Sequence, residues 1–383
     1  MKVFYEFGLK QINKKEEELC GDNVEFSAGP DLTTLVFSDG LGSGVKASIL
    51  STLTTRIAVR MLDEGLPLED VVQTVSKTLP ICRIRKIAYS TFSMAQLFPE
   101  GLAKLVVFDN PAPFLVHRDK TQNLPYEECE VGGKPICDYA FELVPGDWLV
   151  LVSDGVLNAG IGGAYPLGWG WEEVARYLEN HVHDSLSAEE LAEKLGWVVE
   201  ELYEGSPGDD VTIAVVKVRL ERTLMIFAGP PIDRKDDRQV VDTLMSTHGR
   251  RIVCGGTTAN IVARELGKEI TVDMETGTDV VPATGRIRGI DLVTEGTLTL
   301  SRTLDILRSD QPTGELKLRI DGASSLVVLL READKIKILL GRAINPAHQN
   351  PNLPKDLGLK KQVVQALSEE LRRRGKRIEI EYF

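Results

Sequence analysis

The chain has 383 residues, enough for two or three domains with full hydrophobic cores. Its hydrophobic share of 43% and its charged share of 27% are ordinary for a soluble globular protein. The formal net charge of −12 argues against nucleic acid or an anionic membrane as the main partner, because both repel an acidic surface.

The first half of the chain combines many strands with a few helices. Alternating or continuous apolar runs predict strands at residues 3–7, 33–37, 88–97, 102–108, 114–117, 148–152 and 211–219. Helical periodicity predicts helices at residues 43–62, 68–79, 170–180 and 188–203. Several strands follow one another without an intervening helix between residues 88 and 152, which favours an antiparallel sheet with helices on its faces over a doubly wound parallel sheet.

After residue 218 the pattern changes to strands that alternate with helices. The runs LMIFAGPP, RRIVCGG and DKIKILLG are typical of buried strands, and KRIEIEYF closes the chain. Helices are predicted at residues 237–246, 259–266 and 359–374, and a loop at residues 345–358. The alternation predicts a separate, smaller α/β domain over residues 221–383, after a first domain over residues 1–220.

Aspartates stand at four places where predicted strands of the first domain begin or end. They are found in CGDN, LVFSDG, VLVSDG and GSPGDDVTIAVVKV, and are Asp22, Asp39, Asp154 and the adjacent Asp209 and Asp210. One such aspartate is usually ordinary turn chemistry. Four sets on one sheet could not all ionise without a cation, and oxygen ligands select Mg²⁺ or Mn²⁺. Two such ions can activate a bridging water for in-line attack on phosphorus, so the pattern suggests hydrolysis of phosphate esters.

In this order the motifs GD, FSDGLGSGVKAS, LVSDG and GDDVTIAVVKV resemble those of the metal-dependent PPM-type Ser/Thr protein phosphatases, in particular the bacterial SpoIIE-like branch, over residues 3–219. The resemblance implies an αββα sandwich, in which two antiparallel sheets are flanked by helices, with a site for two Mn²⁺ or Mg²⁺ ions at one edge. It also implies hydrolysis of phosphoserine or phosphothreonine on a bacterial signalling protein, such as a STAS-type anti-sigma-factor antagonist.

The resemblance also implies a role for each acidic residue. The implied metal ligands are Asp22, Asp39, Gly40 through its carbonyl, Asp154, Asp209 and Asp210. Asp22 and Asp39 would bridge the two ions, Asp154 and Asp209 would hold the second ion, and Asp210 would be an auxiliary ligand. Asp22, Asp39 and Asp154 would carry catalysis through the bound metals.

The sequence departs from the family pattern at two places. FDNPAPFLV stands where many relatives have an N-A-G-H-P turn, and no arginine precedes the first aspartate. Lys10 or Lys14 could bind the substrate phosphate in its place, or both could be solvated surface charges.

Two competing interpretations deserve comparison with this one. Gly42, Gly44 and Ala47 fit the dinucleotide fingerprint G-x-G-x-x-A, with Asp63 about 20 residues further on. A dinucleotide unit needs a strand after the glycine-started helix, whereas a second amphipathic helix follows here, so we interpret Asp63 as a surface residue at a helix end.

The other alternative is a catalytically inactive regulatory or binding protein of the PPM fold. The complete set of aspartates favours an active enzyme.

Other motifs carry weaker predictions. His181 and His183 could bind a metal, but their neighbours are typical of a surface. The segment PLGWGW (166–171) could form a flap beside the metal edge.

In RRIVCGGTTANIVARELG of the second domain, the turn could offer backbone N–H groups to an anion; alternatively, Thr257 or Thr258 is an ordinary helix N-cap. The start of DLVTEGTLTLSRTLDIL has the same ambiguity. We expect the second domain to sense a small ligand or to dock a partner protein. The sequence is also compatible with a homodimer.

The cysteines and the apolar segments predict a cytoplasmic protein. The five cysteines are odd in number and include no C-x-x-C pair, as expected of free thiols in a reducing compartment. The opening MKVFYEFGLKQ is too short and too polar for a secretory signal. No apolar run approaches the roughly 18 residues that a membrane helix needs.

Overall fold

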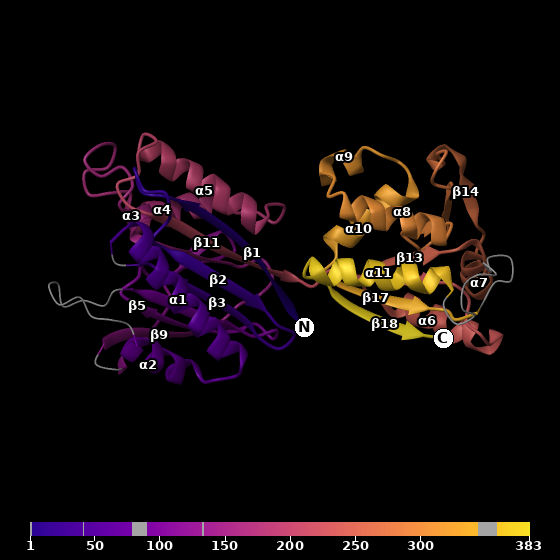
Figure 1. Cartoon of the computed structure of the whole chain (residues 1–383), viewed down its shortest axis with the longest axis horizontal. Helices are drawn as coiled ribbons and strands as arrows, with labels where there is room; N and C mark the ends of the chain where they lie inside the picture. The colour runs from indigo at the N-terminus through magenta and orange to yellow at the C-terminus, as the bar shows by residue number, and fades with distance from the viewer. Residues whose placement is uncertain (1, 41, 79–89, 132–133, 344–357) are drawn as a thin grey trace. The chain divides into compact units, whose positions relative to one another are not determined.

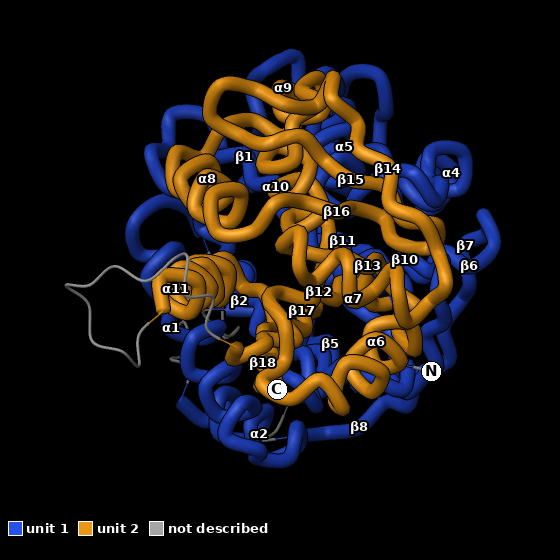
Figure 2. The backbone as a smooth tube through the Cα atoms, turned by 90° about the vertical axis from the view of Figure 1, so that its right-hand side faces the viewer, with its two compact units in different colours: residues 1–220 blue, residues 221–383 orange. Residues whose placement is uncertain are grey.

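The computed structural model describes residues 2–40, 42–78, 90–131, 134–343 and 358–383. The chain forms two compact units, Met1–Leu220 (unit 1) and Glu221–Phe383 (unit 2), which Figure 2 shows in separate colours. Three sequence predictions fall partly outside the described residues: the loop at 345–358, the first residues of the strand at 88–97, and the last residue of the helix at 68–79.

Unit 1 contains two sheets in which all the paired strands are antiparallel. The strand orders are β1-β11-β10-β6-β7 and β2-β3-β4-β5-β9-β8. The first sheet consists of β1 (Val3–Ile12), β6 (Phe114–His117), β7 (Lys120–Gln122), β10 (Trp148–Val152) and β11 (Val211–Leu220). The second consists of β2 (Asn23–Ala28), β3 (Thr33–Ser38), β4 (Phe92–Leu97), β5 (Leu102–Phe108), β8 (Glu127–Val131) and β9 (Lys134–Glu142).

Helices cover the outer face of each sheet of unit 1 (Figure 1). They are α1 (Gly44–Asp63), α2 (Leu68–Thr78), α3 (Asp154–Leu157), α4 (Gly170–His181) and α5 (Ala188–Leu202). Alternation along β11 sends Ile213 toward α4 and α5, and Ala214 and Val216 into the core between the sheets. On β3, Phe37 enters that same core while Val36 packs against α1 and α2. These layers confirm the predicted αββα sandwich.

Unit 2 is built on one seven-stranded sheet of order β14-β15-β16-β13-β12-β17-β18. Its strands are β12 (Thr223–Ala228), β13 (Arg250–Cys254), β14 (Thr271–Asp273), β15 (Thr284–Arg286), β16 (Leu292–Thr294), β17 (Lys335–Leu340) and β18 (Arg377–Tyr382). Its helices are η1 (Arg234–Asp236), α6 (Asp237–Ser246), α7 (Gly256–Leu266), η2 (Met274–Thr276), α8 (Thr297–Arg308), α9 (Thr313–Lys317), α10 (Gly322–Glu332) and α11 (Leu359–Arg373). The strands from β16 to β18 are parallel, and β14 and β15 pair antiparallel at the other side of β16.

The sheet of unit 2 is doubly wound. From β12 the chain moves outward to β13 and β16, and then returns to the other side of β12 as β17 and β18. Leu224 and Ile226 on β12 pack against α8, α10 and α11, whereas Met225 and Phe227 pack against α6 and α7. Figure 1 shows α8, α10 and α11 together on one side of β17. The strand order therefore reverses between β12 and β17.

Several elements were not predicted from the sequence. They are β2, β7, β8, β9, β14, β15, β16, α3, α9, α10, η1 and η2. Several of these strands have only three residues, too few for a recognisable alternation, and β2 is only half-buried. Five helices, α1, α4, α5, α6 and α11, were predicted to within one residue of their bounds, because their apolar stripes face a core.

The predicted start of α7 is wrong. Neither Thr257 nor Thr258 is its N-cap: the helix begins at Gly256, after Gly255 with φ 115°. Because Gly255 turns the chain with a backbone conformation that favours glycine, helical geometry starts before the threonines. The Thr258 hydroxyl instead accepts a hydrogen bond from the Gly229 N–H at 3.0 Å.

In the part of the chain that the structure describes, we find no helix that combines the length and the apolar character needed to cross a bilayer.

Candidate active site

The structure gathers the predicted aspartates at one edge of unit 1. Asp22 precedes β2 and Asp39 follows β3, so the register that pairs Asn23 with Ser38 places them side by side. From the other sheet, Asp154 opens α3 just after β10, and Asp209 and Asp210 precede β11, the neighbour of β10. We call these five aspartates the acidic edge. Both sheets of the sandwich contribute to it.

Asp22 and Asp39 are the most strongly coupled members of the acidic edge. Their carboxyl groups share a hydrogen bond, which requires a proton on one of them. Burial is the main cause that raises the pKa of both groups. The charge of Asp210 raises the pKa of Asp22 further, and the charges of Asp22 and Asp154 do so for Asp39. Without a bound cation, one of these two carboxyl groups keeps a proton, because two neighbouring carboxylate charges would repel each other.

The other three aspartates surround this pair. The pKa of Asp154 is raised, first by desolvation and then by the charge of Asp209. Asp210 is 4% exposed, and its Oδ1 accepts the Lys14 N–H at 3.0 Å. Asp209 Oδ1 accepts the Asp210 N–H at 3.0 Å, which ties the two carboxylates to one turn.

The glycines of the two Ser-Asp-Gly motifs allow close backbone packing at this edge. A Cβ atom on Gly40 would overlap the Ala47 carbonyl in the first turn of α1. A Cβ atom on Gly155 would overlap the Asp210 carbonyl, just before β11. Glycine is therefore required after each aspartate, since any side chain would push that aspartate away from its neighbours.

Polar side chains hold the acidic edge from the core side. Gln11 Nε2 donates to the Asp22 carbonyl at 3.2 Å and to Thr212 Oγ1 at 3.1 Å. The hydroxyls of Thr212 and Ser153 hydrogen-bond to the Asp22 carboxyl and lower its pKa, against the effect of burial. Sequence reasoning did not assign Gln11 or Thr212, because a polar residue within a strand has no local signature of its partner.

The donor set fits hard divalent cations. Asp22 Oδ2 and Asp210 Oδ2 are buried and have no hydrogen-bond partner within the described residues. Oxygen atoms of this kind are the ligands that Mg²⁺ and Mn²⁺ prefer. Across the described ranges, no three His, Cys, Asp or Glu side chains are already arranged around one metal position.

The two candidate lysines differ in position. Lys10 Nζ forms an ion pair with Glu193 on α5 at 2.8 Å. Lys14 Nζ lies 3.9 Å from Asp209 Oδ1, at the acidic edge itself. Lys14 is thus the lysine with a position suited to an anionic substrate.

The remaining sequence candidates have structural partners. Asn110, in the segment that replaces the N-A-G-H-P turn, donates to Ser93 Oγ at 3.0 Å. His181 and His183 are exposed, and their Nδ1 atoms contact the Tyr177 carbonyl and Ser185 Oγ. In the segment PLGWGW, Trp169 is buried in the core, Trp171 stacks on Phe114, and the Leu167 side chain is 90% exposed.

The dinucleotide fingerprint has no matching strand. Helix α1 is followed by helix α2, as the sequence suggested. The carboxylate of Asp63 accepts hydrogen bonds from Ser27 and Thr34, so it ties the end of α1 to β2 and β3.

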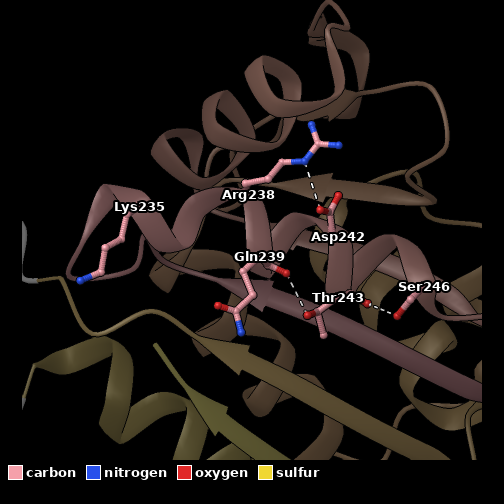
Figure 3. Close-up of a pocket in the computed structure, with 6 residues that line it drawn as sticks. All are labelled: Lys235, Arg238, Gln239, Asp242, Thr243 and Ser246. Carbon is pink, nitrogen blue, oxygen red and sulfur yellow. Dashed lines mark hydrogen bonds and ion pairs between the residues drawn. The ribbon is translucent and has the colours of Figure 1, made fainter.

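Unit 2 has a shallow hollow along η1 and α6 (Figure 3). It is lined by Lys235, Arg238, Gln239, Asp242, Thr243 and Ser246. Arg238 pairs with Asp242, and the hydroxyls of Thr243 and Ser246 donate to carbonyls of their own helix. Lys235 pairs with Asp233 beside the hollow. Most of these groups therefore already have partners, and we assign no site there.

Comparison with known proteins identifies the first unit. Residues 29–219 match the family model described as Stage II sporulation protein E (SpoIIE). No curated protein matches the chain.

Solved structures of low identity were also found. The phosphatase domain of SpoIIE from Bacillus subtilis is 19% identical, with 57% of this chain and 94% of that chain covered and a TM-score of 0.44. RsbX in complex with magnesium is 18% identical, with 56% and 95% covered and a TM-score of 0.42. The PP2C domain of SiaA from Pseudomonas aeruginosa is 16% identical, with 55% and 84% covered and a TM-score of 0.42.

Proposed function

The chain carries a domain of the SpoIIE-like PPM family at residues 29–219, and on this premise we propose that unit 1 is a metal-dependent phosphoprotein phosphatase. One observation carries the proposal: aspartates from both sheets meet at one edge, with two buried carboxylate oxygens left without partners in the described structure. We further propose that the phosphoamino acid is serine or threonine, on a bacterial signalling protein such as a STAS-type anti-sigma-factor antagonist.

The acidic edge would hold two ions of Mn²⁺ or Mg²⁺. Asp22 and Asp39 would bridge them, with the Gly40 carbonyl as a further ligand, and Asp154 and Asp209 would hold the second ion. Asp210 would be an auxiliary ligand. When bound, the ions supply an activated water and neutralise charge on the phosphoryl oxygens.

The side chains of unit 1 would prepare this site. Asp39 must lose the proton that it shares with Asp22 before both carboxylates can act as ligands, so metal binding releases a proton. Gln11, Thr212 and Ser153 hold the Asp22 segment in place during this change. The Lys14 ammonium group would contact the phosphoryl oxygens of the substrate, since it already lies beside Asp209.

An exposed apolar ridge on α1 supports a protein substrate. Val45, Ile49, Leu53 and Ile57 recur every four residues, and each side chain is at least 41% exposed. The ridge begins five residues after Gly40, on the helix against which Gly40 packs. Contiguous exposed apolar surface of this kind usually binds another protein.

The test is metal-dependent hydrolysis by the full chain. We expect Mn²⁺ to support hydrolysis of p-nitrophenyl phosphate and of a phosphoserine peptide, and EDTA to remove both activities. Asp154→Asn should lose both activities while its circular dichroism spectrum stays native. If the Mn²⁺-loaded protein is inert on both substrates, the phosphatase proposal fails and the inactive regulatory protein becomes the better interpretation.

A further inference from the structure

The carboxyl ends of the neighbouring strands β12, β13 and β16 lie at one end of the sheet of unit 2. Gly229 follows β12, Gly255 follows β13 and Gly296 lies two residues after β16. In doubly wound sheets, ligands bind outside the carboxyl ends of the strands, at the point where the strand order reverses. Gly229 lies at that point, and Gly255 and Gly296 follow the next two strands of the sheet. We call Gly229, Gly255 and Gly296, with the helix starts beside them, the glycine edge.

Two helices begin side by side at the glycine edge. Gly255 is the N-cap of α7 and Gly296 is the N-cap of α8. Because both residues are glycine, neither N-cap offers a side-chain capping bond. A Cβ atom on Gly296 would lie 3.4 Å from Gly255 Cα, so the two N-caps are in contact. The Glu295 carboxylate accepts the Leu298 N–H at 3.2 Å and is the acidic group at the start of α8. Paired helix N-termini concentrate backbone N–H groups and positive potential at one point.

Two buried threonines lie on either side of the N-cap of α8 in the chain. Thr294 is the last residue of β16 and Thr299 is in the first turn of α8; their residues are 3% and 0% exposed. The Thr299 Oγ1 atom has no hydrogen-bond partner within the described parts of the chain, whereas the Thr294 side chain hydrogen-bonds to the Cys254 thiol. The carbonyl of Thr294 accepts the Gly255 N–H at 2.9 Å, which connects these hydroxyls to the α7 turn. Buried hydroxyls are normally satisfied, so the Thr299 hydroxyl indicates a missing partner.

A half-buried lysine reaches the same edge from α11. The Lys360 Nζ atom lies against Gly229, where a Cβ atom would overlap it. No hydrogen bond or ion pair of Lys360 is found to any described residue, and burial lowers its pKa. On the other face, Thr258 contacts both Gly229 and Gly255, its Oγ1 lying 3.1 Å from the Cβ position of Gly255. A continuous series of contacts thus joins Lys360 to the two N-caps.

From this arrangement we propose that the glycine edge binds a phosphate group of a small molecule. The backbone N–H groups at the starts of α7 and α8 would donate to the phosphate oxygens, with Thr299 as a side-chain donor. The Lys360 ammonium would balance the charge of the ligand. This site is separate from the acidic edge, and the proposal does not depend on unit 1 being a phosphatase.

The test measures phosphate binding with the acidic edge disabled. The full chain carrying Asp39→Asn, kept in EDTA, is labelled with ¹⁵N-glycine and titrated with inorganic phosphate and, in a second arm, with adenosine monophosphate. We expect the amide signals of Gly255 and Gly256 to shift and saturate. Tighter binding of the nucleotide would assign a nucleotide, and equal binding would assign free phosphate.

Matched variants separate binding from folding. Lys360→Met and Thr299→Val should each weaken phosphate binding about tenfold, because each removes a group that contacts a charged ligand. Lys361→Met, the exposed neighbouring lysine, and Thr303→Val should leave binding unchanged; Thr303 is buried but bonded to the Thr299 carbonyl at 2.8 Å. The proposal is overturned if the glycine signals do not respond to either ligand, or if Thr299→Val only raises the unfolding temperature and leaves phosphate binding intact.

Discussion

The acidic edge of unit 1 and the glycine edge of unit 2 both lie at the ends of strands, yet they gather opposite charge. In the antiparallel sandwich, turns from two sheets bring five carboxylates to one edge. In the parallel sheet, crossovers bring helix starts to the carboxyl ends, so the groups that gather there are backbone N–H groups. In this protein the acidic edge is therefore suited to cations, whereas the glycine edge is suited to anions.

The largest expected effect is a loss of phosphatase activity that depends on the acidic edge and not on the glycine edge. Asp39→Asn should reduce kcat/KM for p-nitrophenyl phosphate at least about a hundredfold, because a lost metal ligand removes several kcal/mol of transition-state stabilisation. Phosphate binding at the glycine edge, followed by the amide signals, should be unchanged. Asp63→Asn is the control, since Asp63 only ties α1 to β2 and β3. Equal losses in both variants would contradict the assignment of the acidic edge.

The next effect compares one glycine from each edge. Gly155→Ala should lower the free energy of unfolding by about 2 kcal/mol, because its methyl group would overlap the Asp210 carbonyl. Gly256→Ala should change it by less than about 0.5 kcal/mol, since nothing lies within 4 Å of the added atom. Urea unfolding of the full chain measures both. A neutral Gly155→Ala would show that α3 is not held against β11 by close backbone contact.

The pH dependence of stability tests the electrostatics of the acidic edge. Folding raises the pKa of Asp22 from 3.8 to about 7 and that of Asp39 from 3.8 to about 9. Well below the unfolded pKa of 3.8 both states are protonated and no stability is lost. As pH rises above 4, the unfolded chain ionises first, so the metal-free fold loses stability up to about pH 9.

The expected result is a falling unfolding temperature of unit 1 in EDTA between pH 4 and pH 9. Mn²⁺ should restore it at high pH, and Asp39→Asn should make the decline smaller. In unit 2, Arg374 lowers the pKa of Asp310 and Glu370. These two groups therefore stabilise the fold at pH values above their unfolded pKa, and this stabilisation is lost as the pH falls. The same pH profile in wild type and Asp39→Asn would rule out a coupled carboxyl pair.

The smallest expected effect concerns the two lysines of β1 and the loop after it. Lys14→Met should raise KM for a phosphorylated substrate about fivefold, the equivalent of about 1 kcal/mol for an exposed charge pair, with little change in kcat. Lys10→Met should leave both constants unchanged, because Lys10 pairs with Glu193. Steady-state kinetics on a phosphoserine peptide distinguishes them, and identical constants for both variants would remove Lys14 from the substrate site.

The fold of unit 1 was largely predictable because its signals are local. Strands such as β3 and β10 are continuous apolar runs that end at Ser-Asp-Gly, and α5 carries a buried stripe. The short edge strands β7 and β14 were missed, since three residues do not establish an alternation. The N-cap of α7 was missed because the positive φ of Gly255 is a property of the folded turn.

By itself, the sequence determined the identity of the acidic groups, their positions at strand ends and the order of elements around them. Only the tertiary structure decided which groups meet: that Asp22 shares a proton with Asp39, that Lys14 and not Lys10 reaches the acidic edge, and that Lys360 lies against Gly229. The physical reason is that periodicity and turn chemistry act over a few residues, whereas these contacts join residues that strand pairing brings together from distant parts of the chain.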